Sequence, residues 1–300
     1  MQPKRLAREA YTVAWVCALP LEMAAANAML DDTHEPLAMN PNDSNVYAFG
    51  RIGPHNVVIA YLPSGHLGMV NAAVVANDIR RSFPSIHIWL MVGIGGGVPG
   101  KVDIRLGDVV VSHPTGGSSG VLQYDVGKAI LDGRFERTRT LCKPPQSVLT
   151  AVANLRAKHE AQRNEVPAIL ADMEKRNPYM SEYLYKSMGE DRLFQAFYEH
   201  AAGDTCDDCD MSQVVERELR PEADTPRIHY GIIASGNQVM KHAQTRDRLA
   251  KDQGIICFEV EAADLMDNFP CLVVRGICDY ADSHKTKQWQ RYAAATAAAT

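Results

Sequence analysis

The segment from Ile255 to Asp279 reads IICFEVEAADLMDNFPCLVVRGICD and decides the fold, because it joins two apolar strands through one short helix. Strand-forming residues dominate Ile255–Val260 and Cys271–Cys278, whereas Glu261–Asn268 is rich in helix formers. Buried strands that alternate with helices are typical of an α/β sheet with helices on both faces. The segment therefore predicts an α/β fold, with acidic residues where its strands end.

The same alternation extends outward to both ends of the chain. Helices are expected at Leu21–Leu30, Asn71–Arg81 and Gln238–Lys251. Further strands are expected at Tyr11–Leu19, Asn45–Ile52, Asn56–Leu62, Ile86–Val92, Asp108–Ser112 and Ile228–Ala234. Together these elements predict a three-layer α/β sandwich with a twisted central mixed sheet, formed by residues 1–300 as one domain.

Residues from about 144 to 226 differ in amino-acid composition from the rest of the chain. Charged residues and helix formers dominate there, which predicts a helical insertion or lid. Phe194, Phe197 and Tyr198 recur at helical spacing and are expected to form a small core of the lid itself. The closing RYAAATAAAT is a strong helix former without a stop signal, which indicates a longer parent protein.

Composition excludes several classes of function. Among the 300 residues 46% are hydrophobic, and the formal net charge of −5 offers no broad basic surface for nucleic acid. No apolar run reaches 18 residues, so no membrane span is expected. The seven cysteines are odd in number and four lie in strand-like runs, which favours reduced thiols in the cytoplasm or the nucleus.

Acidic side chains follow several predicted strands. Glu22 follows the first strand, Glu259 and Glu261 end the CFEVEA strand, and Asp279 ends CLVVRGIC. Ligands of open α/β sheets bind at the carboxyl ends of the strands. A helix N-cap is the ordinary alternative for any one of these residues, but several of them beside a glycine-rich segment favour a binding site.

The glycine-rich segment Gly93–Gly97 follows a buried strand and predicts a turn that a ligand can approach closely. Its spacing, GIGGG, does not match G-x-G-x-x-G, and no Gly-Lys-Ser/Thr follows it. The segment is therefore neither a dinucleotide fingerprint nor a P-loop.

Five segments carry a resemblance to the purine nucleoside phosphorylase and uridine phosphorylase superfamily. The sequence is similar above all to methylthioadenosine/adenosylhomocysteine nucleosidases and to fungal nucleoside-phosphorylase-like domains. The segments occur in the family order and are CALPLEMAAA (17–26), VGIGGGVPGKVDIRLGDVVVS (92–112), GIIASGNQV (231–239), FEVEAADL (258–265) and VVRGICDYAD (273–282). The insertion with its CDDCD resembles the fungal domains only.

The resemblance implies a metal-free and cofactor-free cleavage of the bond between a purine and its ribose. Asp279 would protonate the purine at N7, Glu261 would bind the ribose hydroxyls, and Glu22 would deprotonate the attacking water. The partner would be a small purine nucleoside or nucleotide, and the chain would form a homo-oligomer, with a dimer favoured.

The resemblance also places further residues around the ligand. Val239 and Met240 would flank the base, and Asn237 replaces a common Asp there. The remaining candidates are Phe258 beside the base, Glu259 and Val260 beside the ribose, and Gly93, Ile94 and Gly95 in the glycine-rich segment.

Water is favoured over phosphate as the nucleophile. Bacterial phosphorylases carry two arginines and a hydroxyl residue where this chain has Glu22, Met91 and Ile94. A carboxylate repels phosphate, whereas it can accept a proton from water. Arg80, Arg81 or an arginine of a second subunit could still supply charge, so a phosphorylase stays open, as does a nucleoside-sensing module of a multidomain protein.

The substrate is expected to carry adenine, but adenosine, methylthioadenosine and ATP all stay open. Glu22 suits a neutral sugar edge. A phosphorylated 5′ end would need cations from the insertion, such as Lys175, Arg176 and Lys186.

Other candidate groups have ordinary explanations. Cys206 and Cys209 form one CxxC near His200, but a structural zinc site needs four ligands and no second pair occurs at suitable spacing. No G-x-S-x-G surrounds Ser64, His66 or His113, which excludes a serine hydrolase of that type. Tyr124 and Asp125 are expected in a loop, with contact to the ribose 5′ side as the alternative, and Arg275 is expected to pair with a carboxylate.

Overall fold

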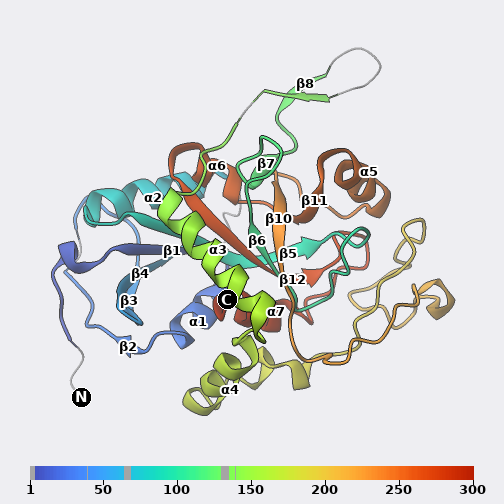
Figure 1. Cartoon of the computed structure of the whole chain (residues 1–300), viewed down its shortest axis with the longest axis horizontal. Helices are drawn as coiled ribbons and strands as arrows, with labels where there is room; N and C mark the ends of the chain where they lie inside the picture. The colour runs from blue at the N-terminus through green and yellow to red at the C-terminus, as the bar shows by residue number, and fades with distance from the viewer. Residues whose placement is uncertain (1–3, 39, 64–68, 130–134, 139) are drawn as a thin grey trace.

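A computed structural model describes residues 4–38, 40–63, 69–129, 135–138 and 140–300. The central sheet has ten strands, and its first six are β1 (Val13–Cys17), β2 (Asp32–Thr33), β3 (Tyr47–Ile52), β4 (His55–Tyr61), β5 (Ile88–Gly97) and β6 (Val109–Ser112). The other four are β7 (Val121–Gln123), β10 (Ile228–Ser235), β11 (Ile255–Glu259) and β12 (Cys271–Asp279). The strands run in the order β11-β10-β6-β12-β5-β1-β4-β3-β2, with β7 beside β10 (Figure 1).

The sheet is mixed, as the sequence predicts. Strand β1 pairs in parallel with β4 and β5, and β5 pairs in parallel with β12. Strands β3 and β4 are antiparallel, as are β12 and β6. A separate hairpin joins β8 (Gly127–Ala129) to β9 (Phe135–Arg137).

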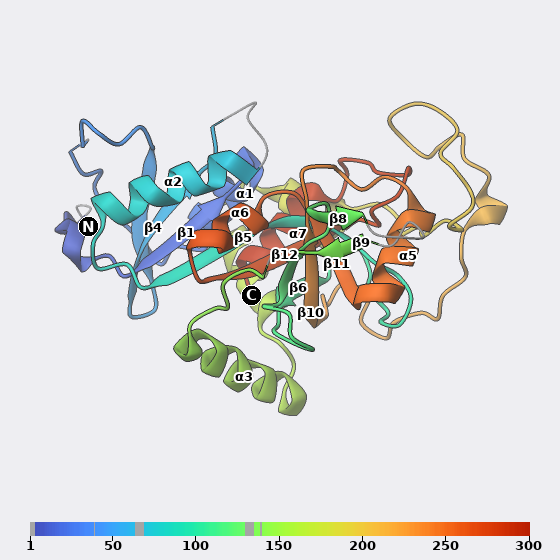
Figure 2. The same cartoon turned by 90° about the horizontal axis from the view of Figure 1, so that it is seen from above.

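Helices cover both faces of the sheet, which confirms the three-layer prediction (Figure 2). Helices α2 (Met69–Ser82) and α6 (Ala262–Asn268) pack together on one face. Helices α1 (Pro20–Ala28) and α7 (Gln290–Ala298) pack together over the other, where α3 (Gln146–Ala161) also lies. Because side chains alternate along a strand, Val16 of β1 enters the first layer and Trp15 enters the second.

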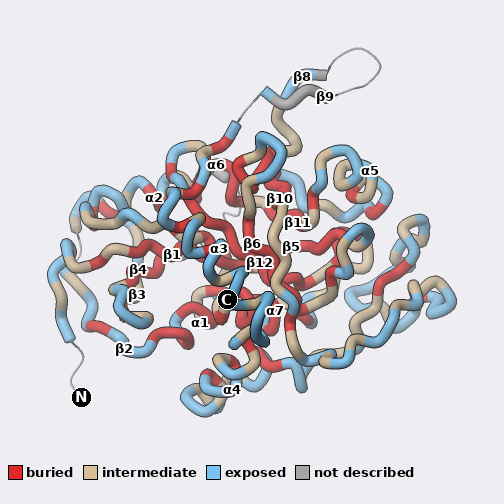
Figure 3. Tube along the Cα trace, in the orientation of Figure 1, coloured by how far each residue is buried: buried red, intermediate tan, exposed pale blue. Residues whose placement is uncertain are grey.

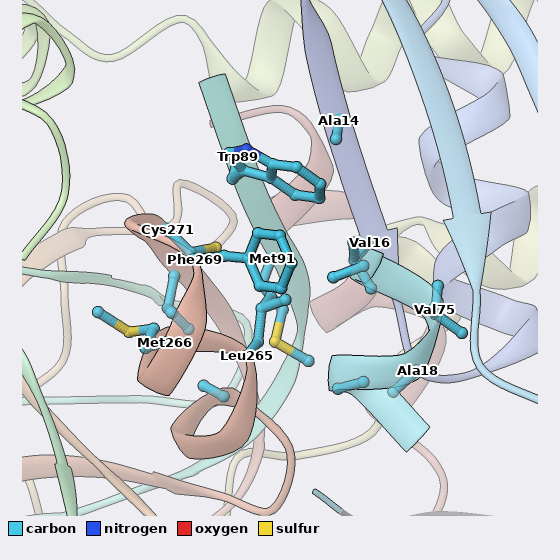
Figure 4. Packing of buried hydrophobic residues seen from close by; sticks show 14 of the residues in the cluster. Ala14, Val16, Ala18, Val75, Trp89, Met91, Leu265, Met266, Phe269 and Cys271 are labelled. Carbon is cyan, nitrogen blue, oxygen red and sulfur yellow. The ribbon is translucent and has the colours of Figure 1, made fainter. Parts of the chain in front are cut away.

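The core is densest along the middle strands, where buried residues predominate (Figure 3). Between the sheet and helices α2 and α6, Trp89 lies against Phe269 with ring centroids 4.7 Å apart. Met91 and Leu265 lie next to Phe269 in the same layer, and Val75 lies near Val16 and Ala18 (Figure 4). This apolar layer holds α6 in place, and α6 begins directly after Glu261.

Strand β5 corrects the predicted glycine-rich turn. Gly93–Gly97 continues the strand rather than leaving it, and it pairs with β12 on one side and with β11 at Gly96 and Gly97 on the other. Neighbouring side chains occupy the space that a Cβ would need: Cys257 Sγ lies 2.7 Å from an ideal Cβ on Gly95. The glycines therefore allow neighbouring side chains to pack closely against the strand. Because β5 pairs with both β12 and β11, the strands β5-β12-β6-β10-β11 form a closed ring.

The insertion is helical only in its first part. Helix α3 is followed by α4 (Val166–Arg176), and beyond α4 the described chain up to β10 forms loops and three-residue 3-10 turns at Ser181–Tyr183, Tyr185–Ser187 and Met211–Gln213. A similar turn at Arg8–Ala10 precedes β1. The predicted aromatic core of a helical lid is wrong, because Phe194 and Tyr198 stack on His284 and Phe197 is 67% exposed.

Helix α5 (Ala243–Gln253) begins later than the sequence predicts. The His242 side chain caps it by accepting the N–H of Thr245, so residues 236–242 form a loop. Within the described parts of the chain, no helix is both long and apolar enough to cross a bilayer.

Gly276→Ala is expected to destabilise the fold strongly. An added Cβ would lie 1.8 Å from the carbonyl oxygen of Ala293, so α7 would have to move off β12. Overpacking of this kind costs about 1–3 kcal/mol or more. The matched control is Gly231→Ala, whose Cβ meets only the flexible end of Ile256. Urea unfolding measures both, and an equal loss in the two variants would contradict the packing described.

Candidate active site

A buried arginine forms the centre of the site. Arg275 lies on β12 with its side chain fully buried, and its Nη2 donates to Glu259 Oε2. Glu261 Oε2 lies 3.6 Å from the same nitrogen. This confirms that Arg275 pairs with carboxylates. Gly93 faces Arg275 across the β12–β5 pairing, and an ideal Cβ on Gly93 would lie 2.5 Å from Arg275 Nη1 and 2.3 Å from Glu22 Oε1.

Glu259 and Glu261 are only two residues apart but differ in their surroundings. The Glu259 carboxylate accepts the N–H of Ala262 at 3.0 Å and that of Glu261 at 3.2 Å. It also accepts a hydrogen bond from Arg275 Nη2. Its side chain is 1% exposed, and its oxygens cap α6. Glu261 has the longer contact with Arg275 and is 9% exposed. Val260, between them, is half-buried.

Glu261 is the less compensated of these two carboxyl groups. Burial raises the pKa of Glu261 to about 8, against the lowering effect of Arg275. The neighbouring carboxylates of Glu259 and Glu22 raise the pKa further. Three carboxyl groups around one guanidinium therefore leave Glu261 with a carboxyl that ionises reluctantly.

Glu22 joins the first loop of the chain to the glycine-rich strand. Its Oε2 accepts the N–H of Ala18 at 2.7 Å and of Leu19 at 2.9 Å, and its Oε1 accepts the N–H of Ile94 at 2.8 Å. The side chain therefore caps the start of α1. Burial raises the pKa of Glu22, and Arg275 with these three hydrogen bonds opposes that shift.

Asp279 is the last residue of β12, where it pairs with Gly96 of β5. Its Oδ1 accepts the N–H of Ala281 at 2.8 Å and lies 3.0 Å from Lys285 Nζ. Its Oδ2 lies 3.2 Å from Cys278 Sγ. Ala281 has a φ of 53°, an uncommon backbone conformation for a residue with a side chain. An ideal Cβ on Gly96 would lie 2.7 Å from Asp279 Oδ1, so this glycine also makes room for the carboxylate.

Lys285 is a site residue that the sequence analysis misses. Burial lowers its pKa, but the charge of Asp279 and its hydrogen bond to that carboxylate contribute to a net rise above the ordinary value. Lys285 lies just beyond the 273–282 segment that carries the family resemblance. The only signal in the sequence is a lysine shortly after an acid that ends a strand.

The predicted base-side residues come together around one loop. The Tyr124 ring meets Phe258 edge to face at 5.4 Å, and its hydroxyl donates to the carbonyl of Gln238 at 2.5 Å. Asp125 accepts the N–H of Asn237 at 2.6 Å. Tyr124 and Asp125 therefore fasten the loop that carries the base-side candidates. In that loop Val239 is 55% exposed, while Met240 packs against the small cluster that contains Phe258.

The cations proposed for a phosphate have other contacts. Arg80 stacks on Phe269 at 5.1 Å, and Arg81 pairs with Asp78 at 2.7 Å. In the insertion, Arg176 pairs with Asp172 at 2.9 Å and Lys186 pairs with Glu174. Lys175 is an exposed residue of α4, and Ser64 and His66 lie outside the described residues.

Comparisons with known proteins identify the family of the chain. The model of the phosphorylase superfamily matches residues 12–300. A nucleotide-binding leucine-rich repeat (NLR)-like protein of Hyaloscypha variabilis is 45% identical over 296 residues, which are 98% of this chain and 29% of that protein. The chain thus spans less than a third of that relative.

Two shorter proteins match over nearly their whole length. A 5′-methylthioadenosine/S-adenosylhomocysteine nucleosidase of Mycobacterium bovis is 24% identical, over 97% of this chain and 94% of its own. The solved futalosine hydrolase of Helicobacter pylori superposes with a TM-score of 0.59 at 15% identity, over 96% of this chain and 94% of its own. At this identity the structural match shows the fold alone.

We expect the free energy of unfolding to fall less with rising pH in the Glu261→Gln variant than in the wild type. The folded chain keeps Glu261 protonated up to about pH 8, whereas the unfolded chain ionises it near the ordinary value of about 4.3. Between these two values unfolding releases a proton, so stability falls as pH rises, by up to about 1.4 kcal/mol per pH unit. Glutamine cannot ionise and removes this contribution.

The measurement is the free energy of unfolding by urea from pH 5 to pH 8. Glu9→Gln, at an exposed position, is the control and should follow the wild type. A Glu261→Gln variant with the same slope as the wild type would show that Glu261 ionises normally in the folded chain.

Proposed function

The chain belongs to the phosphorylase superfamily, and from this premise we propose that it hydrolyses the N-glycosidic bond of an adenine-bearing nucleoside or nucleotide. The observation that carries the proposal is that β11 and β12 end beside the same residue of β5, since Phe258 and Asp279 both pair with Gly96. Asp279 ends β12, and Glu261, Arg275 and Glu22 lie together beside Gly93 of the glycine-rich strand β5. One acid for the base and a carboxylate cluster for the sugar are what glycosidic cleavage requires.

Asp279 would act as the acid on the base side. Lys285 and the Ala281 N–H hold Oδ1, and Oδ2, which lies 3.2 Å from the Cys278 thiol, would face the purine N7. As the glycosidic bond breaks, N7 becomes more basic and takes a proton through Asp279, with the Lys285 ammonium as the adjacent donor. General acid catalysis of this kind is worth about 10²–10⁴-fold in rate.

Glu261 would bind the ribose hydroxyls, and Glu259 would support it. Because Arg275 and α6 already engage Glu259, we assign the sugar contact to Glu261. A sugar hydroxyl that donates to Glu261 favours its ionised form, which burial otherwise disfavours. The anion then stabilises positive charge as it develops at the anomeric carbon.

Glu22 would take the proton of the attacking water. Three N–H groups occupy its oxygens, and a carboxylate has about four acceptor sites, so one acceptor position stays available. The pKa of Glu22, which burial raises, makes it a stronger base than an exposed carboxylate. Ile94 contributes its main-chain N–H rather than its side chain.

Hydrolysis is favoured over phosphorolysis by the charge of the cluster. Three carboxyl groups surround one guanidinium, and the Nη2 of that guanidinium is committed to Glu259. A phosphate 4 Å from one uncompensated carboxylate would be repelled by about 4 kcal/mol per unit charge at an effective dielectric constant near 20. The 5′-methylthioadenosine/S-adenosylhomocysteine nucleosidase among the similar proteins supports the same choice.

A sensing role in a larger protein is the second candidate. The NLR-like relative is more than three times as long as the matched region, so the domain would there be one part of a multidomain chain. Binding alone would not require a half-buried lysine beside an acid at the base position. A domain that senses by cleaving its ligand is compatible with both observations.

The decisive experiment offers adenosine, methylthioadenosine, ATP and inosine with and without phosphate. We expect free adenine and an unphosphorylated anomeric hydroxyl, at a rate that phosphate does not change. Accumulation of sugar 1-phosphate only when phosphate is present would establish the phosphorylase instead. Saturable binding without release of base would establish the sensing module.

Asp279→Asn is expected to lower kcat and kcat/KM together, by about 10²–10⁴-fold, because the acid acts only in the transition state. Steady-state release of adenine measures both constants. Asp252→Asn, on the exposed side of α5, is the control and should keep full activity. A folded Asp279→Asn variant with nearly normal kcat would remove Asp279 from the mechanism.

A further inference from the structure

Four side chains that can bind a metal meet outside the candidate active site. The insertion brings His200, Cys206 and Cys209 together, and the loop after β12 adds His284. Cys209 Sγ lies 3.3 Å and Cys206 Sγ 3.9 Å from His200 Nδ1. Ligand atoms of His200, Cys209 and His284 all lie within 4.8 Å of one another.

These distances suit a tetrahedral metal centre. Zinc binds sulfur at about 2.3 Å and imidazole nitrogen at about 2.0–2.1 Å, so sulfur and nitrogen ligands of one ion lie about 3.6 Å apart. The two measured sulfur–nitrogen distances, 3.3 Å and 3.9 Å, bracket that value. Cys206 Sγ also donates to the His284 carbonyl oxygen at 3.8 Å. A single thiol–imidazole hydrogen bond does not explain two thiols and two histidines gathered in this way.

A hydrogen bond orients the His200 imidazole, and a carboxylate lies near the His284 imidazole. His200 Nε2 donates to the carbonyl of Gly203 at 3.1 Å, which leaves the lone pair of Nδ1 for the sulfurs or a metal. His284 Nδ1 lies 3.9 Å from Asp282 Oδ1 on the opposite edge of its ring. A second polar group beside each ring is the usual surrounding of metal-binding histidines.

The other nitrogen of His284 provides an independent observation. Its Nε2 is buried without a hydrogen-bond partner among the described residues, and the side chain is only 5% exposed. A buried polar atom without a partner is costly and rare. Phe194 stacks on the His284 ring at 4.1 Å with an interplanar angle of 14°, so the ring cannot easily turn toward solvent. A bound cation would satisfy this nitrogen.

We propose that His200, Cys206, Cys209 and His284 form a closed Cys₂His₂ site for a structural zinc ion, which fastens the insertion to the loop after β12. Four protein ligands leave no open position, so the ion would hold structure rather than activate water. The spacing in the sequence shows one CxxC but not this site, since His284 comes from a distant segment. Because Lys285 follows His284 directly, the ion would also hold the lysine beside Asp279.

The test measures metal in the full chain, purified under reducing conditions without added chelator. We expect about one zinc per chain by elemental mass spectrometry. After removal of zinc, titration with Co²⁺ should give the visible bands of a tetrahedral site and the near-ultraviolet absorption of thiolate bound to Co²⁺. Cys209→Ser and His284→Ala should lose both signals, whereas Cys142→Ser, remote from the site, should keep them.

Two outcomes would overturn the proposal. The first is wild-type protein that carries no zinc and gives no thiolate absorption with Co²⁺. The second is a Cys206–Cys209 disulfide in the purified chain, detected by mass spectrometry. If the variants fail to fold, the Co²⁺ titration of the wild type decides alone. All of these readouts are independent of nucleoside cleavage, so failure of the zinc site and failure of the proposed activity remain distinguishable.

Discussion

The burial of Arg275 is the constraint on which the site depends. An unpaired guanidinium inside a sheet would cost several kcal/mol, so the chain must bring acidic partners to it. Those partners come from separate places: Glu22 from the start of α1, and Glu259 and Glu261 from the end of β11. Their approach needs a strand without side chains between them, which the glycines of β5 provide.

The pairing with Arg275 gives Glu259 and Glu261 different surroundings. Glu259 carries most of the neutralisation of Arg275 and caps α6, so its oxygens are occupied. Glu261 is left with a longer contact and a raised pKa, and it becomes the carboxyl group that can respond to a ligand. On the other side of β5, Lys285 balances Asp279. The proposed sugar and base sides thus each have a cation and at least one acid.

Local pattern was sufficient to predict most of the layers but not these pairings. Alternating apolar runs predicted β1, β4, β11 and β12 because each strand buries its own side chains. The glycine-rich segment was misjudged as a turn, because glycine spacing does not reveal that Cys257 and Arg275 fill the empty positions. Composition predicted helix throughout the insertion, although its second half depends on contacts with His284. His284 could not be paired with Phe194, His200 and Cys209, which are far away in the sequence. Lys285 is close to Asp279 in the sequence, but strand pattern does not show that the two side chains meet.

The loop after β12 connects the cluster of His200, Cys209 and His284 to the ion pair of Lys285 and Asp279. His284 and Lys285 are adjacent, yet one meets the insertion through Phe194 and the thiols, and the other meets Asp279. Ala281, with its positive φ, turns the chain between the strand and these two contacts. A loop with such a backbone keeps its shape only if both ends are held. The contact between the insertion and His284 therefore lies one residue from Lys285, which pairs with Asp279. Under the proposed mechanism the insertion would thus help to fix the lysine beside the acid.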